Sequence, residues 1–156
     1  MRKRPIRFAK GLKSLKAINW HTEYLGKPWA ANPSPPESFN CGELVRYIYR
    51  SILGIDSAII PVADAQSALQ CARAMKPEIF DLYPLDDGAE PCEFDVCFMG
   101  RRTLMGHCGI AANTSEGLRI LHCPESACGV TINSPLELKV AGFPLIRWFR
   151  HKDFIC

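Results

Sequence analysis

The sequence predicts a single α+β domain, with N-terminal helices packed on an antiparallel β-sheet. Apolar residues recur with the 3.6-residue period of a helix in residues 41–54. From residue 92 onward, short apolar segments alternate with turn residues, as in antiparallel strands. Helices followed by a run of strands are typical of the α+β class. A length of 156 residues fits one domain with its own core.

A basic arm precedes this domain. Residues 1–16 contain seven lysines and arginines and no acidic residue, so they account for the net charge of +3. We therefore divide the chain into an arm, residues 1–19, and a domain, residues 20–156. We expect the arm to be a solvated tail; contact with an anionic polymer or another subunit is the alternative.

The first helix is expected after a proline-rich loop, which cannot continue a helix. Asn40 is a suitable N-cap and Gly54 a suitable C-terminal stop. Between them, apolar residues share one face: Leu44, Val45, Ile48, Tyr49 and Ile52. A second helix is expected over residues 64–75, capped by Asp64.

Five strands are expected in the second half of the chain, at residues 92–99, 106–112, 117–123, 129–133 and 144–151.

The aromatic residues are dispersed within the apolar pattern, which argues against a nucleic-acid stacking surface. No apolar run approaches the ~18 residues of a membrane span. Eight cysteines include no CxxC pair, so we expect reduced thiols rather than a disulfide scaffold or a zinc ribbon.

Cys41 differs from the other cysteines because it stands at the start of a predicted helix. The unpaired N–H groups and positive dipole end there stabilise a thiolate. The same N–H groups are candidates for an oxyanion hole. Cys41 is therefore a candidate nucleophile; the alternative is a small apolar core residue.

His107 and His122 are candidate partners of that thiol. With a four-residue hairpin loop at 113–116, the two histidines lie directly opposite each other on one face of the sheet. Cys108 and Cys123 then point to the other face, which argues against a zinc site built from the two His-Cys pairs. We expect His21 and His151 to be surface or structural residues.

The stretch "YLGKPWAANPSPPESFNCGELVRYIYRSILGI" resembles the first half of the NlpC-type cell-wall peptidases, which are papain-like cysteine peptidases. Their pattern there is approximately "YLGxPYxxGG…DCSGLVxxVYxxxGI". The later "FDVCFMGRRTLMGHCGIAA" and "LRILHC" are similar to "GDxxFF…xHVGIYxG" and "xxIHA" of that family. The resemblance covers roughly residues 24–125 and is strongest to phage-tail members. It implies a papain-like, NlpC-type fold.

The resemblance also implies roles for single residues. Cys41 matches the nucleophile, His107 the general base and His122 the polar residue that orients the base. The family hydrolyses peptide bonds in peptidoglycan stem peptides, commonly after a γ-linked D-glutamyl residue. Neither a metal nor an organic cofactor is implied.

Four further positions are expected to bind substrate: Trp29, Asn40, Gly42 and Glu43. They are also where the chain departs from the family. Asn40-Cys41-Gly42-Glu43 replaces Asp-Cys-Ser-Gly, and Trp29 replaces a tyrosine whose hydroxyl lies near the reactive centre in relatives. An indole donates one hydrogen bond and accepts none, so these changes bear on the choice of substrate.

The sequence thus predicts a cysteine peptidase or amidase acting on peptidoglycan. No secretory signal is recognised near the start, so we expect synthesis in the cytoplasm and delivery to the periplasm or cell wall by a phage tail, a secretion apparatus or lysis. Two alternatives stay open: a non-catalytic subunit of a phage-tail or secretion assembly, and an acyl-transfer enzyme acting on lipid or protein amides.

Overall fold

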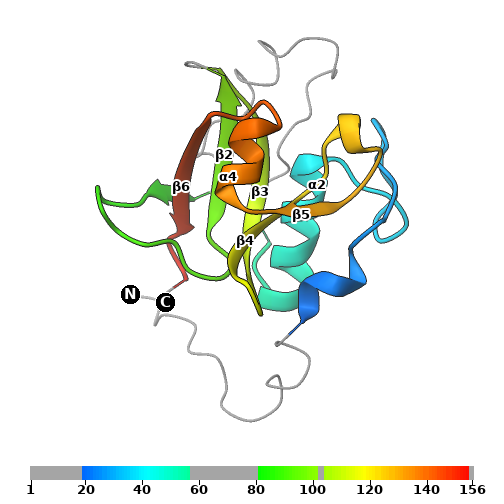
Figure 1. Ribbon diagram of the computed structural model, residues 1–156. Coiled ribbons are helices and arrows are strands. Elements are labelled where there is room, and N and C mark those ends of the chain that lie inside the picture. The colour runs from blue at the N-terminus through cyan, green and yellow to red at the C-terminus, as the bar shows by residue number, and fades with distance from the viewer. Residues whose placement is uncertain (1–18, 57–80, 102–103, 155–156) are drawn as a thin grey trace.

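The computed structural model describes residues 19–56, 81–101 and 104–154 (Figure 1). The expected helix at 64–75 and nearly all of the basic arm lie outside these residues. In chain order the elements are η1 (Trp20–Glu23), α2 (Cys41–Ile48), η2 (Tyr49–Leu53), β1 (Leu82–Pro84), β2 (Val96–Arg101), β3 (Leu104–Thr114), β4 (Gly117–His122), η4 (Glu125–Ala127), β5 (Thr131–Asn133), α4 (Pro135–Val140) and β6 (Leu145–His151).

Helix α2 begins and stops where the sequence predicts. The side chain of Asn40 accepts a hydrogen bond from the N–H of Glu43, which caps the first turn. The helix continues through η2, one turn of π-helix, to Gly54. Gly54 has φ of 68°, the left-handed conformation that glycine adopts most readily.

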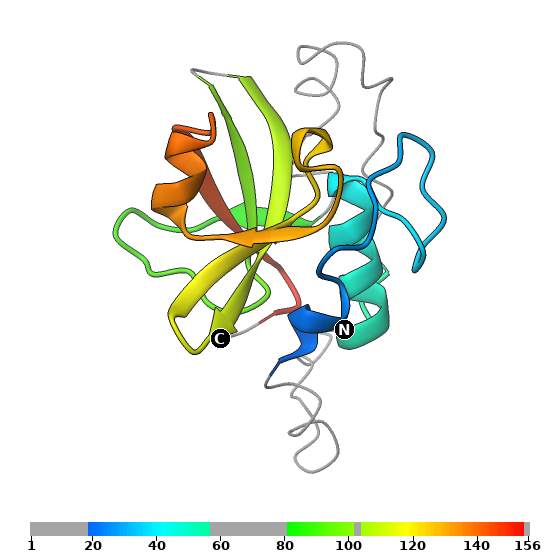
Figure 2. The same cartoon turned by 45° about the vertical axis from the view of Figure 1, so that its right-hand side comes forward.

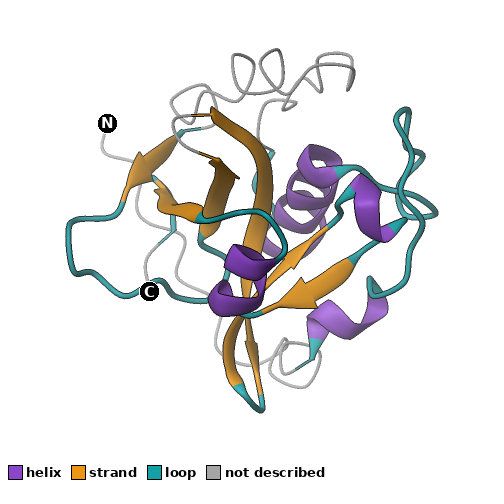
Figure 3. Ribbon diagram, turned by 45° about the horizontal axis from the view of Figure 1, so that its top comes forward, coloured by secondary structure: helices purple, strands orange, loops and turns teal. Residues whose placement is uncertain are grey.

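The strands form one six-stranded sheet in the order β1-β6-β2-β3-β4-β5, and every pairing is antiparallel (Figure 3). All five predicted strands are present. Two further elements, β1 and α4, were not predicted, and they are only 3 and 6 residues long. Short elements carry too few residues for a periodic pattern to stand out.

The predicted register of the β3–β4 hairpin is wrong by two residues. Thr114 pairs with Gly117, so the connecting turn has two residues rather than four. His122 therefore lies opposite Gly109, and His107 is its diagonal neighbour. Because the error is even, both histidines still share one face of the sheet.

Helices cover the two faces of the sheet (Figure 2). On one face α2 packs through residues such as Leu44 and Ile48 in a cluster that includes Cys108 and Ile110 of β3. On the other, Leu138 of α4 joins a smaller cluster with buried residues of β2 and β4. This arrangement places the first residue of α2 beside the middle of β3.

A buried ion pair joins β2 to β6. The carboxylate of Asp95, which has no exposed surface, accepts hydrogen bonds from the Arg150 guanidinium at 2.8 and 2.6 Å. It also accepts the backbone N–H of Cys92 at 2.8 Å. Asp95 is thus a structural residue that fixes the start of β2.

Candidate active site

Cys41 is the first residue of α2, and only 9% of its surface is exposed. Asn40 shapes the backbone here: its side chain accepts the N–H of Glu43 and its carbonyl accepts that of Leu44. The sulfur therefore lies at the positive end of the helix dipole. N–H groups of a helix start favour a negative charge at that position.

Two neighbours lower the pKa of the Cys41 thiol well below its ordinary value. The larger contribution is a hydrogen bond with the Cys108 side chain; His107 adds a hydrogen bond and its positive charge, while burial acts in the opposite direction. The same contact raises the pKa of Cys108. These contacts favour the thiolate form of Cys41, which is the nucleophilic form of cysteine.

The two predicted histidines meet on the sheet. Nε2 of His107 lies 2.8 Å from Nδ1 of His122, and both side chains are buried. Gly109, directly opposite His122, leaves the space that this diagonal contact needs. A Cβ atom at Gly109 would lie 2.7 Å from the Ile120 side chain and 3.1 Å from Cβ of His122.

Asn133 extends this line of side chains and was not predicted. Its Oδ1 lies 2.9 Å from Nε2 of His122. Strand β5 brings it there by pairing with β4 so that Asn133 stands opposite Ile120, two residues before His122. No local pattern in the sequence indicates this role, because the register between β4 and β5 depends on the course of the connection that contains η4.

The hydrogen bonds define one consistent arrangement of protons. If Asn133 Oδ1 accepts the Nε2–H of His122, then Nδ1 of His122 accepts the Nε2–H of His107. Nδ1 of His107 is left to exchange a proton with Cys41. Burial, together with the nearby charge of His107, lowers the pKa of His122 to about 4, so His122 stays neutral and keeps accepting from His107.

Phe143 packs against the face of the His107 ring. It lies in the turn between α4 and β6 and stacks on His107, with ring centroids 4.9 Å apart and an interplanar angle of 22°. Its edge contact with His122 spans 6.3 Å. The stacked ring of Phe143 therefore fixes the orientation of the His107 imidazole.

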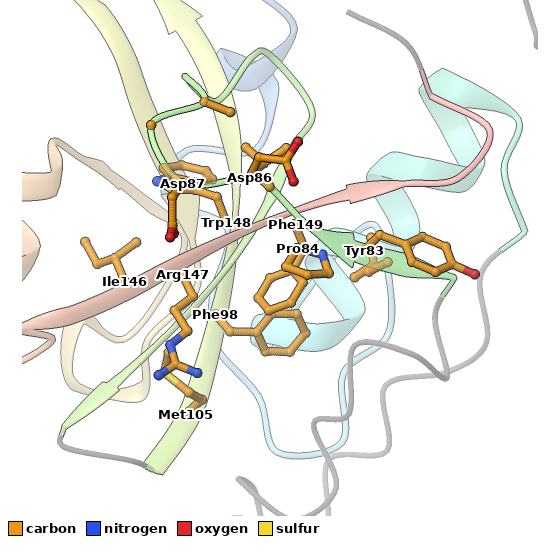
Figure 4. Close-up of a pocket in the computed structure, with 14 residues that line it drawn as sticks. Tyr83, Pro84, Asp86, Asp87, Phe98, Met105, Ile146, Arg147, Trp148 and Phe149 are labelled. Atoms are coloured by element: carbon orange, nitrogen blue, oxygen red, sulfur yellow. The ribbon is translucent and has the colours of Figure 1, made fainter.

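A hollow near the edge of the sheet lies away from these residues. It measures about 780 Å³ and is bounded by β1, the following loop, β2 and β6 (Figure 4). Neither Cys41 nor either histidine lines it. A smaller hollow of about 330 Å³ is lined in part by His107 and Phe143, which places it beside the reactive centre.

Comparison with known proteins agrees with this architecture. No family model and no curated protein matches the sequence. Among solved structures, the NlpC/p60 domain of the peptidoglycan hydrolase SagA superposes with a TM-score of 0.52 and 19% sequence identity, covering 85% of this chain and 94% of that chain. The chain has an NlpC/p60 fold. The expectation of an NlpC-type α+β fold is confirmed at this level; closeness to phage-tail members stays a prediction.

The four predicted substrate-binding residues lie around the start of α2 in this NlpC/p60 fold. Asn40 and Gly42 are buried, and Asn40 serves as the helix cap. Glu43 lies 3.4 Å from Arg46, one turn along the helix. Trp29 is half-buried against the core, and its backbone N–H donates to the backbone carbonyl of Cys128. Their contact with substrate stays a prediction.

The cysteines differ in state. Cys92 is disulfide-bonded, contrary to the expectation of reduced thiols. The other cysteines in the described ranges are free: Cys41, Cys97, Cys108, Cys123 and Cys128.

Within the same ranges no group of three or more candidate ligands is placed to hold a metal ion. No described helix is long and apolar enough to span a membrane.

Proposed function

We propose that this chain is a cysteine peptidase or amidase that hydrolyses peptide bonds in peptidoglycan stem peptides. The observation that carries the proposal is the line Cys41–His107–His122–Asn133, which starts at a helix N-terminus and ends on an amide oxygen. A thiol, an imidazole and a polar group that orients the imidazole form the arrangement of papain-like catalysis. The fold shared with a peptidoglycan hydrolase domain supports the substrate class.

The reaction follows from the positions of these groups. The Cys41 thiolate attacks the amide carbonyl, and the C–S bond forms as the carbonyl electrons move to oxygen. N–H groups at the start of α2 stabilise this oxyanion. The tetrahedral intermediate expels the amine, which takes a proton from the His107 imidazolium. His107 then removes a proton from water, which attacks the thioester and releases the acid and the thiolate.

The proposed substrate bond is the amide after a γ-linked D-glutamyl residue. Such a bond joins two residues of a stem peptide, so the site needs room on both sides of Cys41. Trp29, Asn40, Gly42 and Glu43 border the start of α2 and are proposed to contact the acyl side of the substrate. The replacements at these positions then tune which stem peptide is accepted.

We also propose that the enzyme acts in the periplasm or cell wall. The disulfide at Cys92 fits an oxidising compartment. A phage tail or a secretion apparatus is the proposed route of delivery, with proteins of that apparatus as partners.

Digestion of purified peptidoglycan tests the proposal. Wild type is expected to release new stem-peptide fragments, identified by mass spectrometry, and Cys41→Ala none. Cys97→Ala, which removes another buried free thiol, is the matched control and should retain activity. Identical digests from wild type and Cys41→Ala would overturn the proposal.

A further inference from the structure

The hollow beside His107 is bounded by the ends of β2 and β3 and by the turn after α4. It has a volume of about 330 Å³, within the range of small-molecule sites. Its walls are mainly apolar and include Met99, Leu104 and Phe143. Besides His107, Arg101 is the one ionisable residue among the described residues that line it.

The position of this hollow relates it to one half of the substrate. In the reaction above, His107 gives its proton to the nitrogen that leaves Cys41. The leaving nitrogen must therefore lie beside His107, and the atoms attached to it extend past that ring. The hollow, which His107 itself lines, is placed to receive them.

Arg101 is held at the edge of the hollow by the backbone. Its Nε–H donates to the carbonyl of Gly142 at 3.0 Å. The guanidinium lies close against this glycine, because a Cβ atom at Gly142 would come within 2.8 Å of an Arg101 terminal nitrogen. None of the ion pairs between described residues involves Arg101. Its terminal N–H groups are thus available for a ligand from solution.

We propose that this hollow binds the leaving-group half of the substrate and that Arg101 pairs with a carboxylate there. The inference rests on the proposed function and adds to it a preference for one kind of leaving group. A guanidinium and a carboxylate form two parallel charge-assisted hydrogen bonds, and the single bond to Gly142 prepares the geometry. The preferred leaving group is an amino acid or short peptide with a free carboxylate. Its main chain or side chain packs against Phe143 and Leu104.

A pair of matched substrates tests this preference. Both are the tripeptide L-Ala-γ-D-Glu-L-Lys, with the third residue ending in a carboxylate in one and a carboxamide in the other. Wild type is expected to show a kcat/KM about tenfold higher for the carboxylate, the size of one charge-assisted interaction. Arg101→Gln should reduce this ratio to about one.

Two variants serve as controls. Arg101→Lys keeps the charge without the paired N–H geometry and should retain part of the preference. Arg147→Gln removes an exposed arginine that lines the other hollow and should leave the wild-type ratio intact. A wild-type ratio near one, or an Arg101→Gln ratio equal to that of wild type, overturns the inference while the proposed function stands.

A binding measurement separates failure of this inference from failure of the proposed function. Calorimetry with Cys41→Ala compares lysine and lysine amide, the two leaving groups, without any need for cleavage. Cys41→Ala is expected to bind lysine more tightly than lysine amide. Adding Arg101→Gln to Cys41→Ala should abolish this difference. Equal binding of the two overturns the inference. Absence of cleavage by wild type, with the preference in binding intact, overturns the proposed function alone.

Discussion

Cys41 owes its acidity to a second thiol as well as to a histidine. The Cys108 side chain donates toward the Cys41 sulfur, and this contact is the largest of the interactions that lower the Cys41 pKa. Cys108 is fully buried, so it is protected from solvent and its own pKa is raised. The residue after His107 thus helps to stabilise the Cys41 thiolate.

Cys108→Ala removes this donor, so the pKa of Cys41 should rise. Alkylation of Cys41 by iodoacetamide, followed by peptide mass mapping across a pH series, should show its midpoint moved to higher pH, because only the thiolate reacts. At neutral pH the rate on Cys41 should fall. Cys97→Ala is the control, since Cys97 is buried and does not contribute to the Cys41 shift. An unchanged midpoint in Cys108→Ala would show that Cys108 has no such role.

Strand β5 completes the candidate site by supplying the group that holds the tautomer and orientation of His122. Asn133 binds Nε2 of His122, and His122 in turn binds His107. Because these contacts run in series, a change at Asn133 reaches His107 through the His122 ring. Asn133 is therefore a positioning residue rather than a catalytic one.

Asn133→Ala is expected to lower kcat about 10-fold, the lower end for loss of an outer partner of a functional histidine, with little change in KM. Asn133→Asp, which keeps an acceptor oxygen at this position, should restore much of kcat and move the pH–rate profile, since its charge favours imidazolium. Asn113→Ala removes an exposed asparagine of β3 and is the control. A kcat unaffected in Asn133→Ala, or a loss confined to KM, would contradict this role.

The sequence alone predicts the helix and the hairpin that carry Cys41, His107 and His122. Helix α2 was predicted with its Asn40 cap and Gly54 stop, and the hairpin was predicted to bring His107 and His122 onto one face. The register was off by two residues, and an even error preserves the face. Helix α4 had a recognisable signal that was overlooked: Ser134 and Glu137 form a capping box around Pro135 at the first turn.

The remaining site residues could not be found from the sequence. Asn133 and Phe143 reach the histidines through the β4–β5 pairing and the turn after α4, and no local pattern fixes either arrangement. Cys108 was expected to point away from His107, and the sequence did not show that α2 would cover that face at Cys41. These are tertiary contacts between segments separated by many residues, which periodicity and capping rules do not describe.

At the scale of the whole molecule, the candidate site lies between the helices that cover the two faces of the sheet. Helix α2 and its cluster lie on one face of the sheet, and α4 with Phe143 lies on the other. Cys41 comes from the first layer, the histidines from the sheet and Phe143 from the far side. The reactive geometry therefore depends on the sheet keeping its shape, to which the buried Asp95–Arg150 pair contributes.

Asp95→Ala is expected to lower the free energy of unfolding by about 3 kcal/mol, because it leaves the Arg150 guanidinium without its buried partner. Urea denaturation followed by circular dichroism measures this loss. Asp81→Asn breaks the half-exposed ion pair with Lys152 and suits the positive φ of 54° at this position, so it should leave the midpoint almost unchanged. Equal, small effects of the two substitutions would contradict a structural role for Asp95.

The central claim is that Cys41 forms the covalent intermediate of an amide hydrolysis. Its most direct test is a rapid acid quench of the enzyme during turnover of a stem peptide, followed by mass mapping of every cysteine-containing fragment. The account predicts that the fragment with Cys41 gains the mass of the acyl half of the substrate, and that Cys41→Ala shows neither adduct nor product. Product formation without an adduct on Cys41, or an adduct on another cysteine, would contradict it.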